Sequence, residues 1–175
     1  MPNFLIAKPD ASEYAPYDAR YVDLVPDGDL LGTLAGQIDG TLAELRGITE
    51  EDSLRPYAPG KWSVREVVGH MIDTERIFAY RALRFARHDG TALPGFEQDG
   101  YMTPAQFNQR PWADLLDEFE TVRRSNLLMF RGFSAEAWLR RGIASGNTLS
   151  VRAAACLIAG HERHHMRVLR EMFAT

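Results

Sequence analysis

The residues Ser150–Phe173 read SVRAAACLIAGHERHHMRVLREMF, and this stretch decides the fold. Its apolar side chains recur every three or four residues, the spacing that places them on one face of an α-helix. Two histidines interrupt this face, in a row that runs Val151, Ala154, Ile158, His161, His165, Val168 and Met172. We therefore expect a long, largely buried helix that carries two imidazoles on its inner side.

Three further segments show the same helical spacing. They are Asp29–Gly47, whose glycine suits a helix C-terminus, Ser63–Arg87, and Pro111–Gly132, where proline opens the helix. The second begins with the capping-box pattern Ser63–Glu66. With no convincing run of alternating strand residues, the sequence predicts an all-α four-helix bundle in which residues 1–175 form a single domain.

The connecting segments are rich in proline and glycine. Met1–Gly28 holds four prolines and is expected to be irregular and to wrap the outside of the bundle. Thr91–Arg110 exceeds the usual bundle connection of ~2–8 residues, so we expect it to border a functional site. A short turn of helix is expected over Ser134–Leu139, followed by a glycine-bearing link, Gly142–Asn147.

Composition excludes several classes of function. No apolar stretch approaches the ~20 residues that cross a bilayer, and the N-terminus lacks a signal-peptide pattern, so neither membrane insertion nor secretion is expected. Net charge is −4, with Lys8 and Lys61 the only lysines and the arginines dispersed among acids, which disfavours nucleic-acid binding. The single cysteine, Cys156, lies in an apolar run and is expected to be buried and inert, which fits a reducing cytoplasm.

The histidines carry the main functional signal. His161 and His165 are four residues apart, so their imidazoles can converge on one metal ion, although two buried histidines can also hydrogen-bond without metal. His70, on the apolar flank of the second helix, supplies a third imidazole. Three imidazoles suit a divalent ion, zinc or nickel first and iron also. They leave coordination positions open, which favours chemistry over a purely structural role.

Other residues near this site are interpreted as ordinary parts of a bundle. We expect His164 to point to the bundle edge beside the three histidines, and His88 to be a solvated turn residue rather than a ligand. Asp73 and Glu75 are placed one turn after His70, where a carboxylate can orient an imidazole or accept a proton, but as helix-surface acids near arginines they are expected to be solvated. Trp62 is expected to pack over the start of the second helix.

The motifs Pro59–Ser63, Gly69–Glu75 and Gly160–His165, in this order and spacing, identify a resemblance. The sequence resembles the DinB superfamily of four-helix metalloproteins, in particular its bacillithiol- and mycothiol-transferase-like members, over nearly the whole chain. Glu13–Tyr17 and Tyr21–Pro26 look similar to that family as well. The resemblance implies a DinB-type bundle and places the family's three-histidine metal site on the same three histidines, His70, His161 and His165.

The leading functional hypothesis is metal-dependent thiol S-transfer. A low-molecular-weight thiol would ionise at the metal and attack a small electrophile, with Cys156 not required and with arginines such as Arg76 and Arg81 available to hold an acidic thiol. Two alternatives stay open: hydrolysis by metal-activated water, and a non-catalytic metal- or ligand-binding protein of the stress response. Whether the chain is an enzyme is therefore not decided by its sequence. A homodimer is expected.

Overall fold

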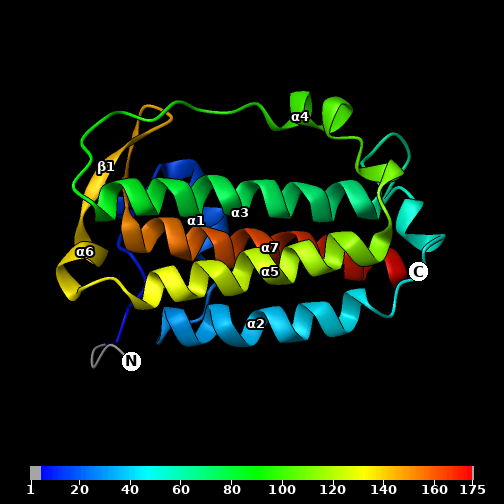
Figure 1. Ribbon diagram of the computed structural model, residues 1–175, viewed down its shortest axis with the longest axis horizontal. Coiled ribbons are helices and arrows are strands. Elements are labelled where there is room, and N and C mark those ends of the chain that lie inside the picture. The colour runs from blue at the N-terminus through cyan, green and yellow to red at the C-terminus, as the bar shows by residue number, and fades with distance from the viewer. Residues whose placement is uncertain (1–4, 175) are drawn as a thin grey trace.

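The computed structural model describes residues 5–174 and consists mainly of four long helices lying side by side (Figure 1). These helices are α2 (Leu30–Leu45), α3 (Val64–Ala86), α5 (Trp112–Arg131) and α7 (Val151–Phe173). The predicted four-helix bundle is confirmed, with helix bounds close to those expected. No helix in the described part of the chain has the length and apolar character needed to span a bilayer.

The order of the helices explains the long connection between α3 and α5. The colour gradient of Figure 1 shows that α2 and α7 run in one direction and α3 and α5 in the other. Because α3 and α5 start at the same end of the bundle, residues 87–111 have to return along its full length. This crossover includes a helix that the sequence interpretation missed, α4 (Gln98–Ala105), and a short η4 (Phe107–Gln109). Gly100 and Pro104 conceal the helical signal of α4.

The helix starts follow the capping rules. The predicted capping box is confirmed, since the Ser63 hydroxyl accepts from the Glu66 amide and the Glu66 carboxylate accepts from the Ser63 amide. Asp29 caps α2, and the Ser150 hydroxyl accepts from the Ala153 amide at the start of α7. Such caps each contribute about 1 kcal/mol and fix where each helix begins.

Helix α7 is the centre of the bundle. Every residue from Ala153 to Glu162 is buried, because α3, α2 and the short α1 (Ala19–Val22) all pack against this half of the helix. Large side chains such as Phe85, Phe130 and Trp138 fill the end of the bundle at which α7 begins. Each buried large apolar side chain contributes about 1.5–3 kcal/mol, so the core fixes the position of α7 against α3.

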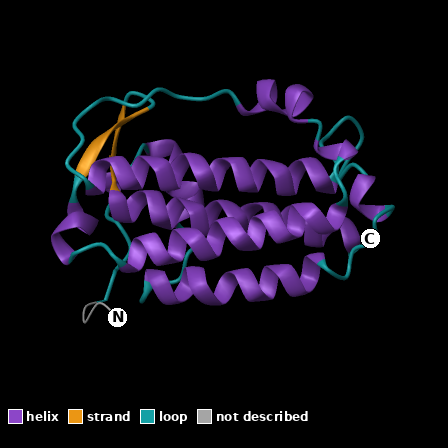
Figure 2. Cartoon of the chain, viewed as in Figure 1, coloured by secondary structure: helices purple, strands orange, loops and turns teal. Residues whose placement is uncertain are grey.

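The expected link at Gly142–Asn147 is wrong: these residues form most of a β-hairpin (Figure 2). Strand β1 (Arg141–Ala144) pairs antiparallel with β2 (Asn147–Ser150) across a two-residue turn. Both turn residues, Ser145 and Gly146, have positive φ, as a hairpin turn of the primed type requires. A Cβ at Gly142 would lie 2.1 Å from the Phe85 ring, so only glycine lets β1 lie this close to α3.

The N-terminal segment is more ordered than its prolines suggested. Its described part contains the short turns η1 (Ala11–Glu13) and η2 (Pro16–Asp18) before α1, while the first four residues of the predicted irregular segment lie outside the described residues. The buried Glu13 carboxylate accepts from Arg152 Nε on α7 at 2.8 Å. This ion pair holds the segment against the bundle. Also present are η3 (Asp52–Leu54) and the predicted short helix α6 (Ala135–Leu139).

Candidate metal centre

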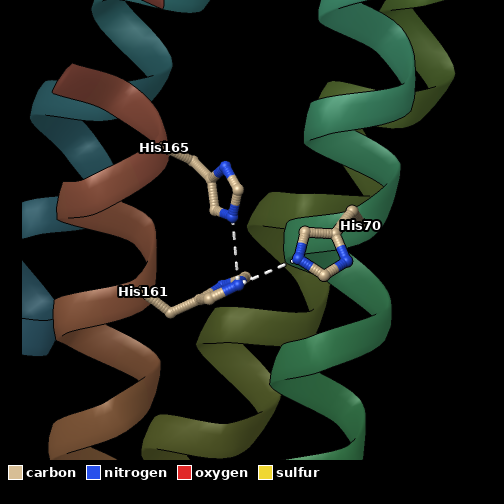
Figure 3. A group of neighbouring side chains, drawn as sticks. All are labelled: His70, His161 and His165. Carbon is tan, nitrogen blue, oxygen red and sulfur yellow. Dashed lines mark hydrogen bonds between the residues drawn. The ribbon is translucent and has the colours of Figure 1, made fainter. Parts of the chain in front are cut away.

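The three histidines singled out from the sequence converge between α3 and α7 (Figure 3). His161 Nε2 lies 2.9 Å from His70 Nε2 and 3.1 Å from His165 Nε2. If one ring nitrogen is taken from each histidine, these three nitrogens all lie within 4.8 Å of one another. The structure thus brings together the residues that the sequence predicted as one site.

Burial keeps these imidazoles neutral. His70 and His161 are only 2% and 7% exposed, and His165 is half-buried. Burial lowers the pKa of His70 to about 4 and that of His165 to about 3, and the pKa of His161 falls well below 6.5. The neighbouring histidines lower the pKa of His161 and His165 further, because a charge on one disfavours a charge on the next. At neutral pH the rings therefore carry free lone pairs.

Hydrogen bonding among the rings cannot satisfy all three. A neutral imidazole nitrogen is either a donor or an acceptor, so His161 Nε2 cannot donate to one neighbour and accept from the other. Two nitrogens that are each about 2.0–2.1 Å from one zinc ion lie about 2.9 Å apart at a right angle and about 3.3 Å apart at the tetrahedral angle. The observed separations of 2.9 and 3.1 Å fall within this window. The donor set and two of its three separations fit one divalent ion, and all three nitrogens lie within 4.8 Å of one another.

A glycine precedes a histidine of the site on each helix, and each glycine allows a close approach. A Cβ at Gly69 would lie 2.5 Å from the Phe107 ring, and a Cβ at Gly160 would lie 2.1 Å from the carbonyl oxygen of Tyr21. The absence of side chains lets η4 pack beside His70 and α1 beside His161. The motifs Gly69-His70 and Gly160-His161 therefore allow close packing next to two histidines of the group.

Aromatic and hydroxyl groups form the walls around the histidines. The Tyr21 ring lies 5.4 Å, centroid to centroid, from both His161 and His164, and the Trp62 ring lies 5.0 Å from His70. Thr74 Oγ1 is 3.5 Å from His70 Nδ1, the nitrogen that faces away from the other histidines. Trp62 also packs on the core beneath it, so its predicted packing role is confirmed.

Two pockets reach the histidine group, one at His161 and the other at His165, while His70 lines neither of them. The Arg81 pocket, about 450 Å³, reaches His161 and is lined by Asp18, Phe78, Arg81 and Ser145 among others. The Lys61 pocket, about 480 Å³, reaches His165 and is lined by Arg20, Lys61, Asp99 and His164 among others. Tyr17, Tyr21 and Gln98 line both. The crossover segment contributes residues to both pockets, as expected for the long connection.

A buried ion network lies behind the site. The Arg123 guanidinium donates to both oxygens of Glu75 at 2.9 Å and to Glu162 at 2.7 Å, and Thr41 donates to the other oxygen of Glu162. The expectation that Glu75 is a solvated carboxylate is wrong, since it is 2% exposed. The network connects the part of α7 beside His161 with α2, α3 and α5. Sequence reasoning missed it because its members come from four different helices.

The remaining predicted residues fall outside the three-histidine group. His164 is half-buried, with its ring 5.0 Å from His165, and His88 is an exposed turn residue with φ of 61°. Asp73 is half-buried rather than fully solvated, and burial raises its pKa. Arg76 is exposed and pairs with Glu118.

The fold and the three-histidine arrangement define the class of protein. The family model of the DinB superfamily matches residues 33–169, so the chain belongs to the DinB superfamily. Among solved structures, it is similar to YfiT from Bacillus subtilis, described as a probable metal-dependent hydrolase with an unusual four-helix bundle topology. That match has a TM-score of 0.71 and 17% identity and covers 94% of this chain and 90% of that one, which shows a shared fold. No curated protein sequence matches.

Proposed function

We propose that His70, His161 and His165 bind one divalent metal ion and that the protein is a metal-dependent thiol S-transferase acting on small molecules. The observation that carries the proposal is the convergence of three neutral imidazoles, two of which also line pockets: His161 lines one pocket and His165 the other. Zinc, nickel and iron all accept three imidazoles. A closed structural zinc site normally takes four protein ligands, so a three-ligand site favours a catalytic role.

The chemistry that such an ion supplies when bound is Lewis acidity, which lowers the pKa of a thiol or water molecule at the site. The protein's own residues supply the setting. The three low histidine pKa values mean that few protons compete for the ring nitrogens at neutral pH. Burial raises the pKa of Tyr21, only partly opposed by Arg20, so its Oη keeps its proton and can donate to a substrate in either pocket.

The two pockets favour transfer over hydrolysis. A transferase has to hold two organic molecules at once, the thiol and the electrophile, whereas a hydrolase holds one and water. Here one pocket reaches His161 and the other reaches His165, with Tyr21 lining both. Each has a volume within or near the range of about 300–1,000 Å³ that small-molecule sites occupy.

Hydrolysis is the second candidate, because the structurally similar YfiT is described as a probable metal-dependent hydrolase. The same donor set can activate water, so the ligands do not separate the two reactions. A non-catalytic metal- or ligand-binding role is the third candidate.

The deciding experiment starts with protein purified without an affinity tag. Its metal content is measured, the metal is removed by chelation, and the protein is reloaded with zinc, nickel or iron. Conjugation of thiols to a model electrophile and hydrolysis of ester and amide substrates are then assayed with and without metal. Metal-dependent conjugation supports the transferase. Metal-dependent hydrolysis alone replaces it with the hydrolase, and no metal-dependent rate in either assay leaves the binding role.

Self-association and location belong to the same proposal. Leu128 of α5 and Leu139 of α6 are 69% and 58% exposed, which supports the predicted homodimer. Light scattering that reports a monomer at micromolar concentration would reject it. The thiol of Cys156 is free and buried, which supports a reducing compartment such as the cytoplasm.

A further inference from the structure

The Arg81 pocket contains a guanidinium that is held in place but has no ion-pair partner among the described residues. Arg81 is 5% exposed, and its Nη2 donates to the Pro94 carbonyl and to Ser145 Oγ, both at 2.9 Å. These bonds use both hydrogens of Nη2 and set the orientation of the guanidinium. Within the described part of the chain, no carboxylate lies within 4.0 Å of Arg81 and no acceptor is recorded for its Nε or Nη1.

Aromatic rings define the space around this guanidinium. Its Cζ lies 5.2 Å from the centroid of the Phe78 ring and 5.8 Å from that of Phe96. Such rings attract a cation and leave its edge, where the N–H groups are, as the direction open to a planar anion. A buried guanidinium with free N–H groups is the arrangement that recognises a carboxylate.

Asp18 brings the opposite charge into the same pocket. It is half-buried, and among the described residues its carboxylate makes no recorded hydrogen bond or ion pair. It lies close enough to Arg81 for each charge to affect the pKa of the other, yet the two do not form an ion pair. Burial dominates both shifts, raising the pKa of Asp18 and lowering that of Arg81. The pocket thus holds two opposite charges apart. The exposed Glu97 adds a second acid at the rim.

We propose that the Arg81 pocket binds a small zwitterionic molecule, the end of an amino acid or short peptide, with its carboxylate on Arg81 and its ammonium group on Asp18. A simple anion would satisfy Arg81 but face the unpaired Asp18, and a simple cation would do the reverse. A zwitterion neutralises both charges, which are costly to leave unpaired in a partly buried site. The placement of its reactive end rests on the proposed function, whereas recognition of its charges does not.

The position of the pocket along α3 indicates how long the molecule is. Arg81 follows His70 by eleven residues, a rise of about 16 Å along the helix, with Thr74 and Phe78 on the same flank. Helical side chains generally point toward the helix N-terminus, which from Arg81 is the direction of His70. A molecule held by Arg81 therefore reaches the histidines only if several bonds separate its zwitterionic end from its reactive group. A thiol-bearing dipeptide or tripeptide fits this requirement better than free cysteine.

The test uses three matched probes and chelator-treated, metal-free protein, with binding measured by NMR chemical-shift titration. L-norleucine carries both charges, hexanoate carries only the carboxylate, and pentylamine carries only the ammonium group. Norleucine is expected to bind about tenfold more tightly than either hexanoate or pentylamine, each of which carries only one of the two charges. Arg81→Gln should weaken norleucine and hexanoate together, whereas Asp18→Asn should weaken norleucine and strengthen hexanoate. Arg87→Gln, which removes an exposed arginine at the C-terminal end of the same helix, should change neither.

The outcomes separate this proposal from the proposed function. Equal binding of norleucine and hexanoate by the unmodified protein, no saturable shift with any probe, or an unchanged preference in Asp18→Asn would overturn it. If Arg81→Gln does not fold, Arg81→Lys retains the charge and loses the planar fork, and is expected to weaken norleucine and hexanoate together. The probes are tested on metal-free protein, so a failure of metal binding or of thiol transfer does not affect these results. If metal-dependent transfer is found but norleucine is not preferred, only the present proposal is overturned.

Discussion

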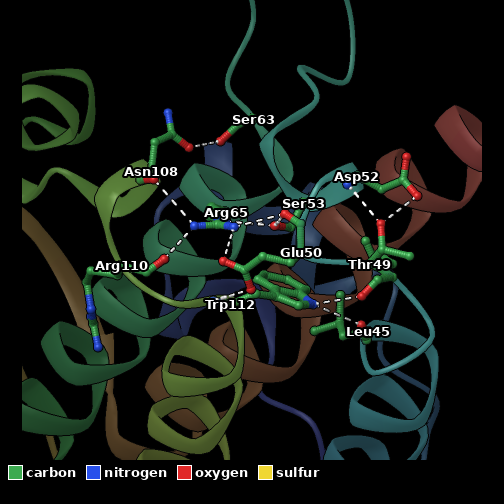
Figure 4. Close-up of polar contacts among 11 residues, drawn as sticks. Leu45, Thr49, Glu50, Asp52, Ser53, Ser63, Arg65, Asn108, Arg110 and Trp112 are labelled. Atoms are coloured by element: carbon green, nitrogen blue, oxygen red, sulfur yellow. Dashed lines mark hydrogen bonds and ion pairs between the residues drawn. The ribbon is translucent and has the colours of Figure 1, made fainter.

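Two buried polar clusters lie at different places in the bundle, and they differ in whether their hydrogen bonds are complete. One centres on Arg65, near the start of α3 (Figure 4). Its five N–H groups meet five acceptors: Ser53 Oγ, the carbonyls of Asn108, Arg110 and Glu50, and the Glu50 carboxylate. A guanidinium has five N–H donors, so this cluster is saturated. The other cluster is the three-histidine group, whose nitrogens face one another.

This difference distinguishes a cluster with a structural role from one that we propose binds a ligand. Arg65 joins the segment after α2 to the segment before α5, and the Glu50 carboxylate also accepts from the Trp112 amide at 3.0 Å. Nothing further can bind there, because every donor is already used. At His70, His161 and His165, one ring nitrogen from each side chain lies within 4.8 Å of the other two. A cluster whose hydrogen bonds are complete stabilises the fold. A group of imidazole nitrogens that face one another is instead suited to binding a ligand.

The largest expected effect concerns metal binding. His161 is the histidine within hydrogen-bonding distance of both others, so His161→Ala removes the centre of the donor set. Loss of an outer-shell partner alone typically costs 10–100-fold in metal affinity, so loss of this ligand should weaken binding by more than about 100-fold. Competition with a chromogenic chelator measures the affinity, and elemental analysis the stoichiometry, which is expected to be one ion per chain.

His88→Ala and His164→Ala are the matched controls. His88 lies in an exposed turn and His164 lies beside the group without belonging to it, so both variants should retain metal. Loss of metal from the His88 variant would show that the ligands are assigned wrongly. Full metal binding by the His161 variant would contradict the functional interpretation of the histidine group.

The second effect should appear in stability alone. Arg65→Met leaves several buried carbonyls without donors, so the free energy of unfolding should fall by about 3 kcal/mol. Glu50 is mostly exposed and can be rehydrated, which limits the loss. Urea unfolding measures the change. Arg55→Met, which removes an exposed arginine paired with Asp52, should change stability by less than about 0.5 kcal/mol. If a folded Arg65 variant lost its metal, the Arg65 cluster would not have a purely structural role, and the proposed difference between the two clusters would be wrong.

The third effect is a pH dependence of the metal-free protein. The pKa of His70 is about 4 and that of His165 about 3 in the folded chain, against 6.5 for an ordinary histidine. Between these values the unfolded chain binds protons that the folded chain does not, so stability is full above pH 6.5 and falls as the pH is lowered toward 4. The slope should be roughly 1.4 kcal/mol per pH unit for each such histidine.

Urea unfolding in chelator at pH 7, 6 and 5 checks this dependence. His165→Gln should have a shallower slope than the unmodified chain, because one of the three histidines of the group, all of which have a lowered pKa, is gone. The His88→Ala variant serves as the control and should keep the full slope. Identical slopes for the unmodified chain and His165→Gln would show that the histidine group does not resist protonation.

The two clusters also differ in how far the sequence predicts them. The histidines stand out because polar residues interrupt an apolar helical row, and the four-residue spacing of His161 and His165 is local. Arg65, Glu75 and Arg123 gave no such signal. Arg123 and Glu75 are 48 residues apart and meet only when α3 packs on α5, so Glu75 looks like any surface carboxylate in the sequence. Pairing between distant residues depends on the fold and cannot be derived from spacing.

The same reason explains the missed hairpin. Strand β1 contains Gly142, which suits a loop when viewed alone and is required only because Phe85 of α3 lies against it. The dipeptide Ser145-Gly146 does carry a turn signal, but each flanking strand has only four residues, too few for a clear alternation. Helix starts, which depend on local caps such as Ser63, were predicted well.

The smallest expected effect tests whether the buried thiol takes part in the chemistry. Cys156 is fully buried, five residues before His161, and burial raises its pKa to about 12, so almost none is thiolate at neutral pH. Cys156→Ala removes one small apolar group and should cost about 1 kcal/mol of stability, measured by urea unfolding, with metal content and thiol conjugation unchanged. An aromatic disulfide reagent should label the native thiol slowly and the unfolded thiol rapidly. If the variant instead kept its metal and lost conjugation, the nucleophile would be Cys156, and the three histidines would no longer suffice to explain the activity.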